Sequence, residues 1–352
     1  MKTAGKILVT ILLLANALAV VLMAASAYSV YFSPIQFPSL SLLGLFFPVF
    51  LATNILFIGL WLLTRKRHVM LSLFGCLLCA NAIRQYIPVN WTVNPPGDTI
   101  KVLSYNVFHY GAHGTKNWDS NDVLQFIKHS DADIVCVQED YWGTGEELDV
   151  ELSNYPYKQH NGINKTTLGL FSKYPVLWSE IIPYETESNG SVAYYLLMEE
   201  DTVLVINNHF ESYKLTTDDK TKYSQMIHAD DSNKNDYIHL YNKMKEVAQL
   251  RSSQVDAVAA YVERSGCRYV ILCGDFNDTP VSYAHQRMMK KLYDVHTASG
   301  NGFDFTYNRN RMYVRIDHLM LSDSWQAYGA KVDKTINTSD HYPLLAYIKK
   351  KR

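Results

Sequence analysis

The order of hydrophobic and polar positions divides the chain into two parts. Long apolar runs occupy the front of the chain, whereas short apolar runs alternate with polar segments farther along. Residues 7–28 and 40–63 are each long enough to cross a hydrocarbon core of roughly 30 Å, and residues 69–87 reach the lower limit of that length. The pattern predicts three transmembrane helices. The residues around Ser26 also resemble a signal-peptidase site, but the run before them is long for a signal peptide and two more follow, so we expect the first helix to be retained.

In the second part, short apolar runs predict β-strands, and apolar residues at helical spacing predict helices. The strand, helix, strand order at residues 100–139 favours neighbouring strands that run parallel. Together these elements indicate an α/β fold. The predicted strands are residues 100–107, 133–139, 168–172, 176–182, 192–198, 203–207, 268–273, 313–321 and 344–348, and the predicted helices carry their apolar faces at residues 123–127 and 237–262.

The distribution of charge supports the same division. Six of the 33 lysines and arginines and none of the 34 acidic residues precede Asp98, so the rest of the chain holds 27 basic and 34 acidic residues, a formal charge of −7. A short run of Asn, Pro and Gly lies where the composition changes, as expected for a linker. We predict a membrane anchor at residues 1–90, a linker at residues 91–97 and a soluble domain at residues 98–352.

The basic residues of the anchor predict its orientation. Lys2 and Lys6 precede the first predicted helix and a basic run at residues 65–68 separates the second from the third, whereas the loop between the first two has no charge. Basic loops stay in the cytoplasm, so three helices place the soluble domain outside it. Tyr86 and Trp91 then suit the outer membrane interface as aromatic anchors.

One stretch of the soluble domain carries the clearest chemistry. Residues 270–273 read as a buried strand, after which Gly274 lets the backbone turn and Asp275 and Asn277 follow. The C-terminal ends of strands are where α/β sheets place their sites. If the strand geometry persists, both side chains point the same way and present a carboxylate and an amide to one small group. Taken alone, these residue types are also ordinary turn formers.

Other predicted strands and adjoining loops also carry polar side chains. Each has an ordinary explanation on its own, because a histidine after a strand is usually a satisfied core or loop residue and a lone glutamate is usually a surface charge. Together, two histidines, an acidic partner for each, a spare carboxylate and two amides are what metal-assisted hydrolysis of a phosphoester requires. The set comprises Asn106, Glu139, His209, Asp275, Asn277, Asp317, Asp340 and His341.

The sequence around these residues forms short motifs, namely Ser-Tyr-Asn106-Val, Val-Gln-Glu139, Asn-His209-Phe, Gly-Asp275-Phe-Asn277-Asp-Thr-Pro, Arg-Ile-Asp317-His and Ser-Asp340-His341. In order and spacing they resemble the motifs of the endonuclease/exonuclease/phosphatase superfamily, which includes deoxyribonuclease-I-like nucleases and neutral sphingomyelinases. The resemblance covers about residues 98–350. It implies a four-layer sandwich, in which two packed mixed β-sheets are flanked by helices, and a divalent metal. The three helices in front look like a bacterial membrane-bound subgroup.

The resemblance and the chemistry of the side chains together imply a Mg²⁺ site, with Mn²⁺ as the alternative metal. A hard cation prefers oxygen ligands, and Mg²⁺ keeps several waters and needs few protein carboxylates. Glu139, with Asn106 beside it, is expected to hold the metal, and Asp340 to add a second contact. A metal at this place neutralises a phosphate oxygen and the leaving alkoxide.

The resemblance also implies acid-base and phosphate-binding roles. His341, oriented by Asp317, is expected to be the general base for the attacking water, with Asp275 as the rival. His209 is expected to donate to the phosphoryl oxygens as charge builds, and Asn277 to orient the same group.

One partner stays open at this point. In related enzymes an acidic residue orients the histidine that corresponds to His209, and the candidates here, Glu185 and Glu187, have no spacing to support either. The arginine-bearing motifs typical of inositol 5-phosphatases are not visible in the sequence, which disfavours that subclass.

The charge of the soluble domain bears on the substrate. Nucleic-acid binding requires a basic groove, because backbone phosphates supply most of the affinity, and this domain is acidic. We therefore expect a multi-pass protein of the bacterial inner (cell) membrane whose extracytoplasmic domain is a Mg²⁺-dependent phosphodiesterase acting on a phospholipid or sphingolipid headgroup by in-line attack of water. The alternatives are an extracytoplasmic endonuclease or exonuclease for DNA or RNA, and a catalytically silent domain that binds phosphorylated ligands or proteins.

Overall fold

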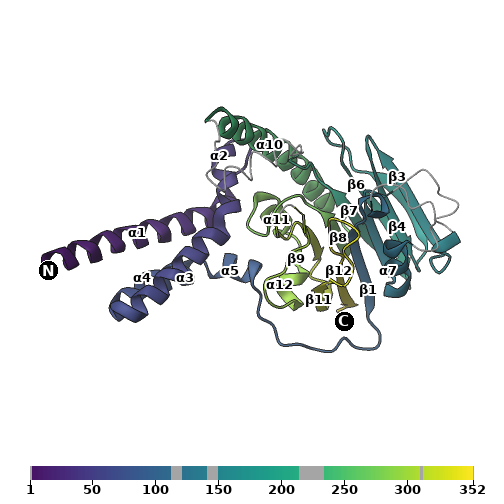
Figure 1. The fold of residues 1–352 in the computed structure, drawn as a ribbon. Coiled ribbons are helices and arrows are strands. Elements are labelled where there is room, and N and C mark those ends of the chain that lie inside the picture. The colour runs from purple at the N-terminus through teal and green to yellow at the C-terminus, as the bar shows by residue number, and fades with distance from the viewer. Residues whose placement is uncertain (1, 112–120, 141–149, 214–233, 310–311, 352) are drawn as a thin grey trace.

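The computed structural model describes residues 2–111, 121–140, 150–213, 234–309 and 312–351. A bundle of apolar helices at the N-terminal end projects from a larger domain built of two sheets with helices outside them (Figure 1). The segment that leaves the last helix of the bundle runs along the edge of the larger domain before it enters the first strand (Figure 1).

Two helical segments of the anchor, Thr3–Tyr31 and Pro38–Thr64, are long and apolar enough to cross a membrane. Asn16 and Asn54 are buried between the helices, where Asn16 donates to Ser72 at 2.7 Å and Trp61 donates to Asn16 at 2.9 Å. Such bonds hold helices together in an apolar medium. The elements are α1 (Lys2–Tyr28), η1 (Ser29–Tyr31), α2 (Pro38–Ser41), η2 (Leu42–Phe46) and α3 (Phe47–Thr64).

The third apolar segment is bent. After η3 (Lys66–His68), helix α4 (Val69–Leu78) ends and α5 (Ala80–Tyr86) continues at an angle of 70°. Length and composition thus allow two spans, or three if the bent pair is one span. The continuous helix predicted for residues 69–87 does not form, because α5 turns to pack against the larger domain.

The first sheet contains both ends of the larger domain's chain. Its order is β11-β12-β1-β2-β4-β3, with β1 and β2 parallel and all other neighbours antiparallel. The strands are β1 (Ile100–Asn106), β2 (Ile134–Gln138), β3 (Tyr157–Ile163), β4 (Thr166–Ser172), β11 (Trp325–Val332) and β12 (Leu344–Lys350).

The second sheet has the order β5-β6-β7-β8-β10-β9, and its one parallel pair is β7 and β8. Both sheets are therefore mixed and six-stranded, which confirms the fold predicted from the sequence. The strands are β5 (Val176–Ile181), β6 (Gly190–Met198), β7 (Asp201–His209), β8 (Tyr269–Asp275), β9 (Tyr293–Asp294) and β10 (Asp317–Leu321).

Three apolar clusters hold the four layers together. One lies between the two sheets, and the cysteine side chains of Cys136 and Cys273 meet within it. A second packs α7 (Asp122–Ser130) on the first sheet, and a third packs α10 (Lys234–Ser265) and α11 (Tyr283–Met288) on the second. The predicted helical faces at residues 123–127 and 237–262 lie in α7 and α10, respectively.

Some strand predictions differ from the structure. The edge strand β3 was not predicted, because its polar sequence is only partly buried. The strand β11 was also missed, although its side chains alternate between buried and exposed. The strand predicted at residues 313–321 begins only at Asp317, and before it Val314 makes an isolated bridge to Tyr307.

The anchor is seated directly on the larger domain along a contact that we call the seam. Val281 of the larger domain is part of the anchor's own apolar cluster, and Gly44 lies against the carbonyl oxygen of Val281. Tyr86 is buried in this cluster and hydrogen-bonds Thr279. The prediction that Tyr86 is a membrane-interface anchor is therefore wrong, because protein and not lipid covers its ring, whereas Trp91 is 95% exposed.

Hydrogen bonds continue the seam past the end of α5. Arg315 is buried and donates to the carbonyl oxygen of Gln85 at 2.9 Å and to Asp294 at 2.9 Å. Asn90 donates to the carbonyl oxygens of Thr297 at 3.1 Å and Gly300 at 2.6 Å, in and just after α12 (Val295–Ser299). The anchor is thus bonded to the larger domain at the end of its last helix and just after it.

The seam predicts the effect of adding one methyl group. A Cβ at position 44 would lie 2.3 Å from the backbone oxygen of Val281, so Gly44→Ala forces the anchor and the domain apart. Overpacking of this kind costs roughly 1–3 kcal/mol, and we expect a lower melting temperature of the full chain in detergent. Gly59→Ala is the matched control, because no atom lies within 4 Å of its Cβ position. Equal melting temperatures for the two variants would contradict the seam.

Candidate active site

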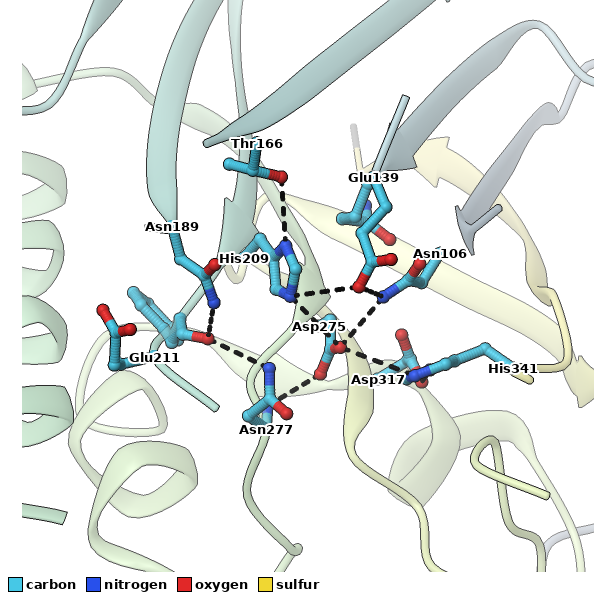
Figure 2. Close-up of polar contacts among 12 residues, drawn as sticks. Asn106, Glu139, Thr166, Asn189, His209, Glu211, Asp275, Asn277, Asp317 and His341 are labelled. Atoms are coloured by element: carbon cyan, nitrogen blue, oxygen red, sulfur yellow. Dashed lines mark hydrogen bonds and ion pairs between the residues drawn. The ribbon is translucent and has the colours of Figure 1, made fainter. Parts of the chain in front are cut away.

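The predicted polar residues meet at one edge of the sandwich, where strands from both sheets end (Figure 2). In the first sheet Asn106 ends β1 opposite Gln138 of β2, and Glu139 follows. In the second sheet His209 ends β7 opposite Asp275 of β8. The parallel pairing in each sheet therefore delivers these side chains to the same edge.

Asn106 joins the two sheets at this edge. Its Nδ2 group donates to Glu139 Oε1 at 3.1 Å and to Asp275 Oδ2 at 3.2 Å, while its Oδ1 accepts from the backbone N–H of Phe108 at 3.1 Å. Asp275 is buried, whereas the side chain of Glu139 is 25% exposed and forms the open side of the cluster. Asn106 thus orients one carboxylate from each sheet.

His341 approaches the same carboxylate from the other side. Its Nε2 lies 3.7 Å from Asp275 Oδ2, and its Nδ1 bonds Asp317 Oδ2 at 2.8 Å. Asp317 begins β10 directly opposite Asp275 in the strand register. His341 itself is fixed by its backbone N–H, which donates to Ser339 Oγ at 3.1 Å. The predicted pairing of His341 with Asp317 is present in the geometry.

His209 faces both carboxylates, with Nε2 3.8 Å from Glu139 Oε1 and 3.7 Å from Asp275 Oδ2. Its other ring nitrogen, Nδ1, lies 3.5 Å from Thr166 Oγ1 (Figure 2). Neither of the two proposed acidic partners, Glu185 and Glu187, is placed against this ring in the described structure. The group at Nδ1 is a neutral hydroxyl from β4, which no motif in the sequence marks.

Asn277 is turned out of the strand direction. The strand β8 ends at Asp275 and Asn277 has a φ of +51°, so the two side chains do not point the same way as an extended strand would require. Instead the backbone N–H of Asn277 donates to Asp275 Oδ1 at 2.7 Å, and its Nδ2 donates to the carbonyl oxygen of Phe210 at 3.0 Å. Through these two hydrogen bonds Asn277 holds Asp275 and Phe210, the residue after His209, in place.

His109 is a site residue that the sequence prediction missed. Its Nε2 lies 3.9 Å from Glu139 Oε2, on the exposed side of the cluster. It belongs to a left-handed turn in which Phe108, His109 and Tyr110 have φ values of +45°, +50° and +57°. Such backbone costs of order 1–3 kcal/mol per residue and tends to occur at functional sites. No motif in the sequence marks His109, which lies three residues after Asn106.

Burial and like charges shift the proton affinities of the cluster. Burial and the neighbouring Asp317 raise the pKa of Asp275 to about 6. Burial acts to lower the pKa of His341, but the carboxylates of Asp317 and Asp275 outweigh it and raise the pKa to about 10. Near neutral pH the imidazole of His341 is therefore charged, and the Asp275 carboxylate can accept a proton.

The donor set fits a divalent cation. Among the described residues, no lysine or arginine pairs with Glu139, Asp275 or Asp317, and the site has an excess of negative charge. Asp340 Oδ1 is buried without a hydrogen-bond partner in the described part of the chain, and burial together with Glu139 raises its pKa. Carboxylate oxygens that have neither a cationic side chain nor a hydrogen-bond donor beside them are suitable ligands for a hard metal ion.

Two groups of side chains in the described residues are close enough to share a metal ion. One is Asp275, Asp317 and His341, within the cluster above. The other is His285, Asp294 and His318, which are buried next to Arg315 of the seam. In that second group the guanidinium of Arg315 already bonds Asp294, so a cationic side chain fills the place of a cation.

Comparison with protein families gives two matches. The model of the endonuclease/exonuclease/phosphatase family matches residues 103–341, and that of a domain of unknown function (DUF8431) matches residues 9–86. No curated protein matches the chain.

Solved structures are similar to the larger domain. An endonuclease/exonuclease/phosphatase from Bacteroides vulgatus has 17% identity and a TM-score of 0.51 over 72% of this chain and 99% of its own. Humanized D. rerio TDP2 has 15% identity and a TM-score of 0.52 over 72% and 99%. The human Nocturnin catalytic domain with bound sulfate has 16% identity and a TM-score of 0.51 over 72% and 95%. At these identities the likeness concerns the fold.

The contact between His341 and Asp317 predicts the effect of removing one charge. Asp317→Asn keeps the shape but removes a carboxylate that raises the pKa of His341, so the pKa falls and the high-pH limb of the rate profile moves to lower pH. We expect kcat for bis-p-nitrophenyl phosphate to fall by roughly 10²–10⁴-fold. Asp323→Asn, at an exposed position after β10, is the control. An unshifted limb with full activity would contradict this role.

Proposed function

The chain belongs to the endonuclease/exonuclease/phosphatase family, and on that premise we propose that it is a membrane-anchored phosphodiesterase that hydrolyses a phospholipid or sphingolipid headgroup. As a member of this family it is a metal-dependent hydrolase of phosphoric esters. The substrate, the choice of Mg²⁺ and the extracytoplasmic side of a bacterial inner membrane are our proposal.

The main support for a lipid substrate is the position of the site relative to the anchor. The loop that leaves Asp275 and Asn277 reaches Thr279 and Val281, which contact the anchor directly. A substrate that must be found by diffusion needs no such contact, whereas a lipid headgroup is presented beside the helices that hold the enzyme. The acidic soluble part, with a formal charge of −7, supports a lipid over nucleic acid.

Asp275 is the side chain that we assign to proton acceptance from the attacking water. Its pKa of about 6 places it close to neutral, where a base combines the deprotonated form with useful basicity. Its Oδ1 accepts from the backbone N–H of Asn277, and its Oδ2 lies 3.7 Å from both His209 and His341, so the carboxylate is held on both oxygens.

His341 is assigned to the phosphoryl group as a charged donor at Nε2. Asp317 holds the proton on Nδ1 and supports the imidazolium, which is why the pKa is raised. His209 presents its Nε2 from the opposite side, and Thr166 contacts its Nδ1 without adding a negative charge. The two rings thus flank the carboxylate and can donate to phosphate oxygens as negative charge develops.

Glu139 and Asp340 are the residues that we expect to hold the metal, with Asn106 orienting Glu139. When bound there, a divalent ion neutralises charge on the phosphate and on the leaving oxygen. Oxygen donors and the absence of cysteine from the cluster favour Mg²⁺ or Mn²⁺ over softer metals.

The metal assignment predicts a loss of binding that is separate from activity. Glu139→Gln removes the exposed carboxylate of the cluster, and we expect the affinity for Mn²⁺, measured by isothermal titration on the full chain in detergent, to fall at least tenfold. Glu200→Gln, an exposed glutamate in the turn before β7, should bind as the parent does. Unchanged Mn²⁺ affinity in both variants would contradict the assignment of Glu139 as a metal ligand.

The substrate assignment is tested with the full chain, because the seam would be exposed in a fragment. In detergent-lipid micelles with Mg²⁺, we expect hydrolysis of sphingomyelin or phospholipid headgroups, abolished by chelator and by Asp275→Asn, and no nicking of plasmid DNA. Cleavage of bis-p-nitrophenyl phosphate reports an intact site independently of the lipid. If DNA is cleaved and lipid is not, the nuclease alternative replaces the lipid proposal, and if nothing is cleaved the chain is a binding domain.

A further inference from the structure

The helix α10 is longer than the sheet that it covers. Its C-terminal part buries Val255, Val258 and Ala259 against the second sheet. Near its N-terminal end the same apolar stripe continues through Tyr237 and Tyr241, with Ile238 beside it, but these three side chains are 42–47% exposed. At 3.6 residues per turn Tyr237 and Tyr241 lie on about the same face of the helix as Val255, and Ile238 lies about 100° around the helix from Val255, next to Tyr241. This part of the stripe therefore extends past the second sheet.

The exposed part of the stripe lies beside the outer end of the anchor. The hydroxyl of Tyr241 donates to Ser39 of α2 at 2.5 Å, and the side chain of Gln249 donates to the carbonyl oxygen of Ile35 at 3.4 Å. Figure 1 shows the beginning of α10 next to α2, level with the ends of the anchor helices where they join the larger domain. The stripe thus reaches the ends of the two candidate spans, at Tyr31 and Pro38.

The anchor loop beside α10 is apolar as well. Phe32, Ile35 and Phe37 are 43–53% exposed, and they connect the ends of the two candidate spans. Aromatic and aliphatic side chains at this level are typical of the interface between hydrocarbon and headgroups. The loop and the beginning of α10 together form one apolar rim that continues the surface of the membrane helices, defined by Phe32, Ile35, Phe37, Tyr237, Ile238 and Tyr241.

We propose that this rim rests on the outer leaflet of the bilayer, so that α10 is a second membrane contact beside the transmembrane anchor. The proposal rests on the proposed membrane anchoring and names the occupant of the rim as lipid. An amphipathic helix that lies in the interface buries its apolar face among headgroups and acyl chains in this way.

The same helix contacts the loop that follows His209. Arg251 is buried in α10 and its Nε donates to the carbonyl oxygen of Glu211 at 2.8 Å, while the backbone N–H of Glu211 donates to Gln254 at 2.9 Å. The rim at Ile238 and this contact at Arg251 lie about 20 Å apart along one rigid helix. Contact of the rim with lipid would therefore fix the distance between the membrane and the C-terminal end of β7, where His209 lies.

The direct test is the depth of a label at Ile238. The full chain is reconstituted into vesicles of phosphatidylcholine and phosphatidylglycerol, with the partly exposed Cys76 and Cys267 replaced by serine, and Ile238→Cys is labelled with an environment-sensitive fluorophore. We expect a blue-shifted emission that is quenched by lipids carrying a nitroxide near the headgroup. Emission as in water, without quenching, would overturn the proposal.

Two control sites separate this proposal from the anchoring on which it rests. A label at Leu56, which is 73% exposed on α3, should be quenched by nitroxide deep in the acyl chains, and a label at the exposed Asn154 near β3 should not be quenched at all. If the Leu56 label is not quenched, the membrane anchor itself is wrong. If Leu56 is quenched and Ile238 is not, only the rim is wrong.

A charge on the rim tests its function. Ile238→Glu is expected to lower hydrolysis of vesicle lipid at least tenfold while hydrolysis of soluble bis-p-nitrophenyl phosphate changes less than twofold. Ile238→Trp should keep or raise lipid hydrolysis, because tryptophan favours the interface. His239→Glu, on the far side of the same helix, is the matched control and should leave both activities unchanged. Equal lipid hydrolysis by Ile238→Glu and His239→Glu would contradict the proposal.

Discussion

The site depends on one parallel pair of strands in each sheet. Because β1 and β2 run in the same direction, Asn106 and Glu139 leave the first sheet at one edge, and because β7 and β8 do so, His209 and Asp275 leave the second sheet at one edge. Packing of the sheets face to face through a shared apolar core then brings the two edges together. The antiparallel neighbours of these pairs add the remaining residues, so that Asp317 arrives already opposite Asp275. Among the described residues, the meeting of Asn106, His209, Asp275 and Asp317 is thus a consequence of strand direction and register.

Much of this was accessible from the sequence because it is local. A buried strand followed by a polar residue is visible within ten residues. Six such motifs, in the order of the endonuclease/exonuclease/phosphatase superfamily, carried a resemblance that implied two mixed sheets and the cluster from Asn106 to His341. What the sequence could not reveal are contacts between segments far apart along the chain. Thr166 lies against His209 across the edge of the two sheets, and nothing in the residues around Thr166 marks it. The left-handed turn at His109 was equally invisible, since its three non-glycine residues have no preference for that backbone.

The anchor and the larger domain illustrate the same limit. Composition divides the chain into an apolar part and a polar part joined by a short linker, and it gives no sign of contacts between the two parts. The structure instead joins them through Gly44, Val281 and Arg315, residues whose local sequence is unremarkable. The bend in the third apolar segment was not predicted for the same reason, because α5 packs against the larger domain. A hydrophobic pattern reports which surfaces avoid water, and it does not distinguish cover by lipid from cover by protein.

The order of the first sheet has a consequence for how the enzyme is made. The strand β12 lies between β1 and β11, so residues far along the chain supply an interior strand beside β1. While the chain is being synthesised, β1 has an unpaired edge that only residues 344–350 can close. His341 lies three residues before that strand and enters the cluster beside it. A chain that lacks residues 341–350 would therefore leave the edge of β1 open and lose His341 from the cluster.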